Sequence, residues 1–294
     1  MKIGIVGAEN SHTAAVARVL NVEKACGSAR VVAVWGETRA FAERAAEQGQ
    51  IPQIVKRPED MIGKIDGVMV DHRHPKHHMA AVRPFLEAGI PAFVDKPFSY
   101  GLAEGWKVLQ FARRKGVAIT SYSVLPEQQS FRDDLMKQIQ AAGTIYGILS
   151  TGACDIKSKY GGIFFYGIHQ VGLLVQAFGP DIETVEVVRA GKGNPNVMAV
   201  MTYRNGGPIV TMECVAAGRS EFALRATGEK AIVNYVHRMD ANAYLTGTKK
   251  FVKMFRTGKA PYTSSEILAP VAVLEALDKA VKTRKCVRVA KLPC

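Results

Sequence analysis

Chemistry is first indicated at the turn that ends the first apolar run of the chain. The turn consists of Gly7, Ala8, Glu9, Asn10, Ser11 and His12. A dinucleotide-binding turn reads G-x-G-x-x-G, and its second glycine lets the pyrophosphate approach the backbone. Here only the first glycine is retained, and Glu9 places a carboxylate where the pyrophosphate would lie. Asn10 and Ser11 can cap the following helix or bind a phosphate, so the turn alone favours a helix cap over a cofactor site.

The end of the second apolar run carries both residue types by which a Rossmann domain selects its cofactor. Glu37 can accept hydrogen bonds from the ribose diol of NAD. Thr38 and Arg39 follow it directly and can hold the 2′-phosphate of NADP. The sequence therefore predicts NAD or NADP as the cofactor and leaves the choice between them open. An exposed helix start is the alternative explanation of these three residues.

A histidine-rich segment follows the third apolar run, and it begins with Asp71, His72 and His74. Clustered histidines can bind a metal ion, but Arg73 and Lys76 would repel a cation, and the spacing does not bring the imidazoles together. We therefore predict no metal site in this chain. Because parallel sheets bind ligands at the carboxyl ends of their strands, we predict a polar or anionic ligand near this segment.

Lys96 follows the fourth apolar run, in the sequence Asp95-Lys96-Pro97. A lysine at the carboxyl end of a strand, next to a conformationally restricted proline, can reach into a ligand crevice. An ion pair with an acid at the surface is the alternative. These residues alone leave both explanations open.

Short apolar runs alternate with helical patterns through the first 120 residues. Strands are predicted at residues 2–7, 30–35, 66–70, 91–94 and 117–121. Helices are predicted at residues 13–20, 39–48, 77–88 and 102–115. This alternation requires right-handed crossovers and is typical of a parallel, doubly wound sheet. Residues 1–120 are therefore predicted to form an α/β dinucleotide-binding Rossmann domain.

Residues 121–294 have a different pattern, in which strands follow one another closely. Strands are predicted at residues 184–189, 197–203, 208–214, 221–226, 230–236 and 287–289. Helices are predicted at residues 131–142, 163–178 and 265–283. Short turns between successive strands favour a mostly antiparallel sheet. We therefore predict a second, α+β domain.

Composition excludes several classes of protein. Of the 294 residues, 48% are hydrophobic and 22% are charged, which is typical of a folded globular protein and not of a disordered one. No apolar stretch is long enough for a membrane-spanning helix, and no signal peptide is recognisable. The five cysteines form no C-x-x-C pair, which favours a reduced, cytoplasmic protein.

The net charge of +13 would suit a protein that binds nucleic acid. However, the excess is concentrated in residues 249–294, which hold 11 basic and 3 acidic residues. The sequence contains neither a recognisable DNA-reading helix nor an aromatic RNA-binding motif. We therefore predict a small-molecule partner, with no nucleic acid and no membrane.

Together these segments resemble the Gfo/Idh/MocA family, which includes glucose-fructose oxidoreductases and inositol dehydrogenases. The resemblance rests on the turn after the first strand and on Asp95-Lys96-Pro97, which corresponds to a Glu-Lys-Pro motif of the family. It also rests on the helix from Gly161-Gly162 to His169. These motifs occur in the order and with the spacing of the family, and the resemblance covers nearly the whole chain.

The resemblance implies a second domain with a large open sheet, which commonly self-associates into a dimer or tetramer. It also implies an enzyme that uses NAD or NADP to interconvert a secondary alcohol and a ketone on a sugar, cyclitol or related polyol. Lys96 would bind the reacting oxygen and His169 would exchange its proton, roles that suit an ammonium and an imidazole.

The chain departs from the family pattern at Phe165, where the family has an acid four residues before the histidine. A phenyl ring cannot orient His169, but the hydroxyl of Tyr166, three residues before it, can lie on the same helical face. Tyr166 is therefore a third candidate catalytic residue. The alternative function is a sensor or regulator of the same fold, which binds a ligand or nucleotide without redox turnover.

Overall fold

The computed structural model describes residues 1–191 and 193–292, and the chain forms two compact units. The first unit consists of Met1–Ser99, Ala103–Tyr122 and Asn242–Ile267. The second consists of Tyr100–Leu102, Ser123–Ala241 and the residues from Leu268 onward. The chain thus leaves the first unit after Tyr122 and later returns to it.

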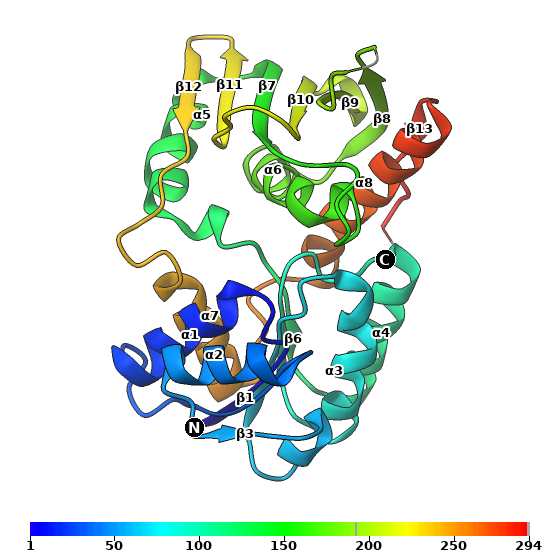
Figure 1. The fold of residues 1–294 in the computed structure, drawn as a ribbon. Coiled ribbons are helices and arrows are strands. Elements are labelled where there is room, and N and C mark those ends of the chain that lie inside the picture. Colours follow the sequence, from blue (N-terminus) through cyan, green and yellow to red (C-terminus); the bar gives the residue numbers. More distant parts are fainter. Residues whose placement is uncertain (192, 293–294) are drawn as a thin grey trace. The chain divides into compact units, whose positions relative to one another are not determined.

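The first unit contains a parallel sheet in the order β3-β2-β1-β4-β5-β6. Its strands are β1 (Lys2–Val6), β2 (Arg30–Trp35), β3 (Gln53–Ile54), β4 (Gly67–Val70), β5 (Ala92–Val94) and β6 (Ile119–Thr120). Its longer helices are α1 (Ser11–Ala17), α2 (Arg39–Gly49), α3 (His78–Glu87), α4 (Leu102–Lys115) and α7 (Leu245–Thr257). Figure 1 shows α1, α2 and α7 on one face of this sheet and α3 and α4 on the other. The predicted doubly wound parallel sheet is confirmed.

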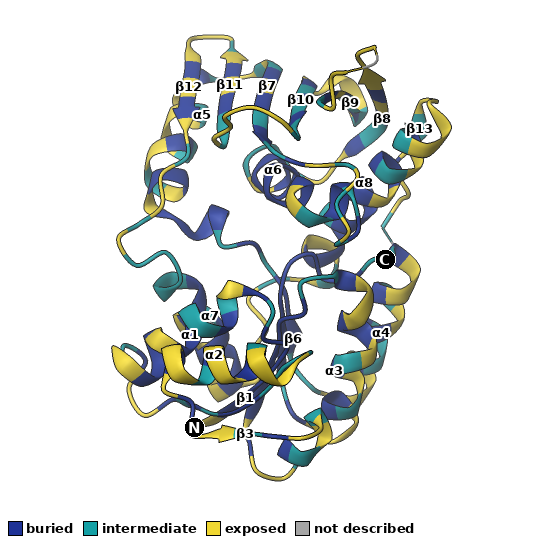
Figure 2. Ribbon diagram, viewed as in Figure 1, coloured by how far each residue is buried: buried dark blue, intermediate teal, exposed yellow. Residues whose placement is uncertain are grey.

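The central strands are buried along their whole length, which explains why they read as continuous apolar runs. Every residue of β4 and β5 is buried, as expected for strands that helices cover on both faces. Figure 2 shows the contrast between the buried strand β1 and the largely exposed outer surface of α2. The edge strand β3 was not predicted, because two residues are too few to form a recognisable strand pattern.

Helix α7 was not predicted either, and its aromatic side chains are part of the core of the first unit. The ring of Phe251 stacks on Phe93 of β5, with 4.9 Å between the ring centroids. Gly67 at the start of β4 leaves room for the ring of Phe255, since a side chain at that position would overlap it. These contacts place α7 in the first unit, although the sequence assigned everything after residue 120 to the second domain.

The second unit contains a sheet in the order β12-β11-β7-β10-β9-β8-β13. Its strands are β7 (Ile145–Ala153), β8 (Ile182–Arg189), β9 (Val197–Tyr203), β10 (Ile209–Val215), β11 (Ala223–Gly228), β12 (Ile232–Val236) and β13 (Val287–Arg288). Its longer helices are α5 (Met136–Ala142), α6 (Ile163–Phe178) and α8 (Ser264–Thr283). All neighbouring pairs are antiparallel except β7 and β10. The predicted mostly antiparallel α+β fold is confirmed, with β7 as a central strand that the sequence analysis missed.

A buried glutamine of α6 ties this helix to the sheet. Gln170 is fully buried, and its side-chain oxygen accepts a hydrogen bond of 2.8 Å from the hydroxyl of Ser150 on β7. Its amide group donates to the backbone oxygen of Glu213 on β10 at 2.9 Å. Because α6 also carries His169, these bonds fix the helix that positions a candidate catalytic residue.

The strands of this sheet also expose several large apolar side chains. These are Tyr146, Leu149, Val188, Met198, Ile209, Ile232 and Val236. Apolar side chains on a sheet often mark an association surface. The predicted homo-oligomer stays a prediction.

The cysteines form no disulfide within the described residues. Cys26, Cys154 and Cys214 are buried and Cys286 is exposed, all as free thiols, and Cys294 lies outside the described residues. In residues 1–191 and 193–292, no helix is long and apolar enough to cross a membrane.

Candidate functional site

The carboxyl ends of β1, β4 and β5 bring a group of polar side chains together in the first unit. This group, called the strand-end cluster below, consists of Asn10, His12, Thr13, Asp71, Asp95 and Lys96. The three strands are neighbours in the parallel sheet, so the loops that follow them meet at one edge. Five of the six residues are buried, and His12 is partly exposed.

Asn10 and His12 connect the turn after β1 to both aspartates. The Asn10 amide group donates to Oδ1 of Asp71 at 3.0 Å and to Oδ2 of Asp95 at 3.1 Å. Nδ1 of His12 lies 3.1 Å from Oδ1 of Asp95 and 3.9 Å from Oδ1 of Asp71. The His12 ring also contacts the ring of Tyr244, with 5.2 Å between centroids. The turn therefore has both a capping and a site-building function, because Asn10 is also the N-cap of α1.

The two aspartates have opposite pKa shifts. Burial, together with the negative charge of Asp95, raises the pKa of Asp71 well above its usual value. Burial also opposes ionisation of Asp95, but the charges of His12 and Lys96 outweigh it and lower the pKa of Asp95. The pair can therefore carry one proton and one negative charge.

Lys96 lies at the end of β5 and is buried. Its Nζ atom is 3.5 Å from Oδ2 of Asp95, and only 8% of its surface is exposed. The predicted alternative, an ion pair at the surface, is therefore wrong, because both partners are buried. Buried charges are costly unless they are paired, and the carboxylate of Asp95 offsets part of this cost for Lys96.

Glu37 closes the turn after β1 by binding its backbone. Oε2 of Glu37 accepts hydrogen bonds of 2.9 Å from the amides of both Ala8 and Glu9. Oε1 is buried and has no hydrogen-bond partner among the described residues. Gly7 is needed here because its φ is +107° and because a side chain would lie 2.7 Å from the backbone of Asp71. The predicted cofactor residues Gly7, Ala8, Glu9 and Glu37 are thus neighbours in space.

Helix α2 begins at Thr38 and Arg39, the two residues predicted to hold a 2′-phosphate, and both contact residues of this helix. The Thr38 hydroxyl accepts a hydrogen bond from the amide of Phe41 at 3.2 Å and caps the helix. Nε of Arg39 lies 2.6 Å from a carboxylate oxygen of Glu43, one helical turn further on, and both side chains are exposed. Ser11 is exposed as well, at the first position of α1.

The histidine-rich segment does not converge on one point. His74 caps a short helix by accepting a hydrogen bond from the amide of Lys76 at 3.2 Å. The ring of His78 lies between two backbone carbonyls, 2.8 Å from that of His72 and 2.9 Å from that of Pro97. His72 is buried beside Trp35, and burial with the nearby charges of His78 and His77 lowers the pKa of His72 to about 3. Among these histidines, the roles seen are therefore structural.

His169 lies in the second unit, on α6, and is buried. The Oγ atom of Ser123 is 2.9 Å from Nδ1 of His169. The same hydroxyl accepts from the amide of Leu125 at 3.3 Å, and it can either donate to Nδ1 or accept from it, depending on the tautomer of the imidazole. Ser123 thus orients the ring that the acid of the family motif would orient.

Tyr166 and Phe165 form an aromatic row with His169. The ring centroids of Tyr166 and His169 are 5.4 Å apart, and those of Phe165 and Tyr166 are 4.7 Å apart. Tyr166 is 38% exposed. Tyr166 therefore lies next to His169, as predicted from its position three residues before His169 in the helix. The two residues contact each other through their rings.

Sequence reasoning missed Thr13, Asp95 and Ser123 as site residues. Oγ1 of Thr13 lies 2.5 Å from Oδ2 of Asp71 and 2.8 Å from the backbone oxygen of Gly7, so its single proton is within reach of both. Asp95 was recognisable as the neighbour of Lys96. Thr13 and Ser123 had no signal in the sequence, because a hydroxyl in a helix or loop is common.

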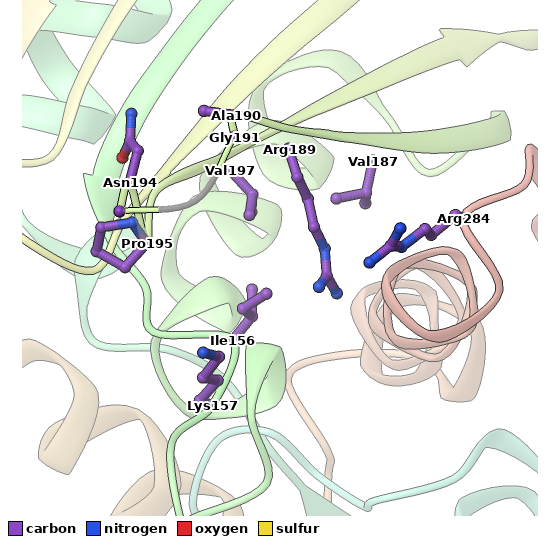
Figure 3. Close-up of a pocket in the computed structure, with 11 residues that line it drawn as sticks. Ile156, Lys157, Val187, Arg189, Ala190, Gly191, Asn194, Pro195, Val197 and Arg284 are labelled. Carbon is purple, nitrogen blue, oxygen red and sulfur yellow. The ribbon is translucent and has the colours of Figure 1, made fainter.

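A cavity of about 570 Å³ lies elsewhere, within the second unit. Figure 3 shows three cationic side chains among those that line it, Lys157, Arg189 and Arg284. Nη2 of Arg189 donates to the backbone oxygen of Val281 at 2.7 Å. None of the predicted site residues lines this cavity, and part of the C-terminal excess of positive charge faces it.

The sequence of residues 1–123 matches the model of the Gfo/Idh/MocA oxidoreductases, described as an oxidoreductase family with an NAD-binding Rossmann fold. The matched part includes the strand-end cluster and Glu37. No curated protein matches the chain.

Solved structures of low sequence identity share the fold over nearly the whole chain. Scyllo-inositol dehydrogenase from Lactobacillus casei has a TM-score of 0.84 at 17% identity and covers 99% of this chain and 98% of its own. Myo-inositol dehydrogenase from the same organism, solved with NAD(H) and myo-inositol, has a TM-score of 0.83 at 16% identity and covers 100% and 98%. GenD2 from gentamicin A biosynthesis, solved with NAD, has a TM-score of 0.84 at 14% identity and covers 99% and 97%. At such identities the comparison establishes the fold.

Proposed function

Because residues 1–123 belong to the Gfo/Idh/MocA oxidoreductases, a family with an NAD-binding Rossmann fold, we propose that the chain interconverts a secondary alcohol and a ketone. The substrate is a sugar, a cyclitol or a related polyhydroxylated molecule, as in the inositol dehydrogenases that share the fold. The observation that carries the proposal is the buried Lys96 at the carboxyl end of β5, charge-paired with Asp95.

The turn after β1 and Glu37 fit the adenosine end of NAD. The unpartnered, buried Oε1 of Glu37 is a free acceptor of the kind that binds a ribose diol. A 2′-phosphate would meet this carboxylate, and Thr38 and Arg39 are engaged in α2, so the site favours NAD over NADP. Glu9 is part of this turn, and its negative charge would repel the pyrophosphate and weaken cofactor binding.

In this proposal Lys96 stabilises charge on the reacting oxygen. An ammonium group in a buried setting lowers the energy of a developing alkoxide far more than it would in water. Asp95 holds the ammonium in place through its Oδ2 atom. Bound NAD would supply the hydride acceptor, and NADH the hydride donor.

His169 exchanges the hydroxyl proton in this proposal. In the oxidation direction the hydroxyl of Ser123 accepts from Nδ1–H, which leaves Nε2 free to take the proton of the substrate hydroxyl and makes the ring an imidazolium. In the reduction direction this imidazolium returns the Nε2 proton to the oxygen of the ketone. Tyr166, beside the ring, is the remaining polar candidate for this site.

Titration of the full-length protein with NADH and NADPH, followed by the fluorescence of the nicotinamide, tests the cofactor assignment. We expect NADH to bind and NADPH to bind more weakly. If neither nucleotide binds at millimolar concentration, the oxidoreductase proposal fails and the sensor alternative is favoured.

Turnover with a panel of inositols and sugars then tests the assigned residues. Lys96→Ala and His169→Ala are expected to lose turnover on any accepted polyol while NADH binding persists. Lys107→Ala and His77→Ala are matched controls, because both side chains are exposed and lie outside the site. Wild-type turnover in either Lys96→Ala or His169→Ala would refute the assigned role of that residue.

A further inference from the structure

We propose that the cavity of the second unit binds a phosphate group, either as free phosphate or as part of a small phosphorylated molecule. The cavity has a volume of about 570 Å³. Small-molecule sites typically have volumes of about 300–1,000 Å³. The charged residues that line the cavity in the described part of the chain are Lys157, Arg189 and Arg284. None of them has a role in the proposed redox reaction, so this inference goes beyond the proposed function.

The three cationic side chains come from three separate elements of the second unit. Arg189 is the last residue of β8, Arg284 directly follows α8, and Lys157 lies in the loop between β7 and α6. Figure 3 shows all three side chains directed into the same space. Like charges repel one another, so this arrangement is unfavourable without a counter-charge. A bound anion would replace the repulsion by attraction.

No protein carboxylate supplies this counter-charge within residues 1–191 and 193–292. In that part of the chain no acidic residue lines the cavity, and no ion pair involves any of the three cations. Acids on the same elements have other partners. Asp155 accepts a hydrogen bond of 2.8 Å from the backbone amide of Lys157, and Asp278 of α8 pairs with Lys282. The cavity therefore has a net positive charge that suits an anionic ligand.

The alternative is that the arginines only stabilise the end of α8. Nη2 of Arg189 donates to the backbone oxygen of Val281 in the last turn of this helix, and cations stabilise a helix C-terminus. That terminus carries about half a negative charge, which is less than the charge of one arginine, so the cavity stays cationic. Capping also leaves Lys157 unexplained, because this residue belongs to the loop before α6.

The lining favours phosphate over a carboxylate. A phosphate monoester carries a charge of about −1.5 to −2 near pH 7 and offers three acceptor oxygens, whereas a carboxylate offers one charge and two oxygens. Guanidinium groups bind phosphate through paired N–H donors. Ile156, Val187 and Val197 add an apolar surface to the cavity, and the two valines are buried. This surface can contact the carbon skeleton of an organic phosphate.

Isothermal titration calorimetry of the full-length protein, in a phosphate-free buffer without nucleotide, tests the proposal. The probes are inorganic phosphate, glucose 6-phosphate and succinate. We expect one phosphate group per chain with a Kd below about 1 mM, and weaker binding of succinate. Tighter binding of glucose 6-phosphate would assign the site to an organic phosphate, and equal affinities would assign it to free phosphate. Tighter binding of succinate, or no binding of either phosphate at about 1 mM, would overturn the proposal.

Variants of the lining assign the bound phosphate to this cavity. Arg189→Gln and Arg284→Gln are each expected to weaken binding about 10-fold, as for the loss of a charge-assisted hydrogen bond, and Lys157→Gln should weaken it as well. Arg219→Gln is the control, because Arg219 is exposed in the same unit and does not line the cavity. Circular dichroism checks that each variant is folded. Undiminished phosphate binding in the folded variants, with a lower melting temperature of the two arginine variants, would show that the arginines only cap α8 and would refute the site.

A measurement on the wild-type protein keeps the proposal testable even when the variants do not fold. Phenylglyoxal modifies exposed guanidinium groups, and mass spectrometry of the digested protein identifies the modified arginines. The tighter-binding phosphate should protect Arg189 and Arg284 from modification, while Arg219 reacts equally with and without it. Equal modification of Arg189 and Arg284 in both samples would contradict binding in the cavity.

Discussion

Nδ1 of His12 lies 3.1 Å from Oδ1 of Asp95, so the turn after β1 is joined directly to the end of β5. In the dinucleotide fingerprint the position of His12 is a glycine, which lets helix and strand pack closely. One of the two residues that depart from the fingerprint, His12, is thus a residue that contacts the Asp95-Lys96-Pro97 segment. The replacement of this glycine by His12 adds an imidazole to the site. The sequence alone would indicate only that the motif is degenerate.

Gly7 is the fingerprint glycine that remains, and its replacement should disturb both the turn and the strand-end cluster. Gly7→Ala would force a side chain to within 2.7 Å of the Asp71 backbone at a φ of +107°. Gly63→Ala is the matched control, because Gly63 also has a positive φ, +80°, but nothing lies within 4 Å. We expect the control to cost about 1 kcal/mol and Gly7→Ala to cost at least about 2 kcal/mol more, measured by urea unfolding. Equal costs would show that the contact with Asp71 is unimportant.

Ser123 should act on catalysis through His169. Ser123→Ala removes the hydroxyl 2.9 Å from Nδ1 and leaves the imidazole less well oriented. On any accepted polyol we expect kcat to fall about 10-fold, the effect of one lost hydrogen bond of about 1.4 kcal/mol, with KM little changed. Ser123→Thr, which keeps the hydroxyl, should restore much of the rate. A rise in KM at constant kcat would instead indicate a role in substrate binding.

The architecture could be predicted because burial leaves a direct pattern in the sequence. Strands β4 and β5 are buried throughout and therefore read as apolar runs, and the helices between them repeat at regular spacing. Strand β7 was missed because Gly147 and Gly152 interrupt the apolar pattern in the sequence. In addition, both its buried and its exposed positions include polar and apolar residues, so the two types do not alternate. Helix α7 was missed because it packs against β5 through Phe251, a contact between segments far apart in the chain.

The site could be predicted only in part, for a different physical reason. A sequence indicates which residues follow a strand, so Asn10, His12 and Asp71 were recognised as candidates at the carboxyl ends of parallel strands. It does not indicate which side chains then bind one another, so the contacts of Asn10 and His12 with Asp95 were not foreseen. Ser123, from a loop, could not be assigned to His169 at all.

Phe251 should be essential to the stability of the first unit. Its side chain is 1% exposed and contacts Phe93 and Phe255. Phe251→Ala should destabilise the protein by about 3–5 kcal/mol, since it leaves a large cavity. Lys253→Ala on the exposed side of the same helix should change stability by less than about 0.5 kcal/mol. Differential scanning calorimetry measures both, and similar melting temperatures for the two variants would contradict the assignment of α7 to this core.

His237 in the second unit should make stability depend on pH. Burial lowers the pKa of His237 to about 4, against about 6.5 in the unfolded chain, although the charge of Asp240 opposes the shift. Between these values the unfolded chain binds more protons, so stability is complete above about pH 6.5 and falls as the pH drops toward 4. Because the ring is only partly buried, we expect the loss to be about 1 kcal/mol. His237→Gln should remove this part of the slope in urea unfolding between pH 4.5 and 7, and an unchanged slope would assign it to another group.

Glu37 should determine the choice between NAD and NADP. Its Oε2 atom binds the amides of Ala8 and Glu9, and its Oε1 atom is free to accept from a ribose hydroxyl. Glu37→Gln keeps one acceptor for the amides but removes the negative charge. We therefore expect NADH binding to weaken about 10-fold, as for a hydrogen bond to a charged group, while NADPH binding stays the same or improves. Glu43→Gln, an exposed acid on α2, is the control and should change neither affinity. Parallel losses for NADH and NADPH in Glu37→Gln would show that Glu37 stabilises the turn without reading the ribose, and the preference for NAD would then need another cause.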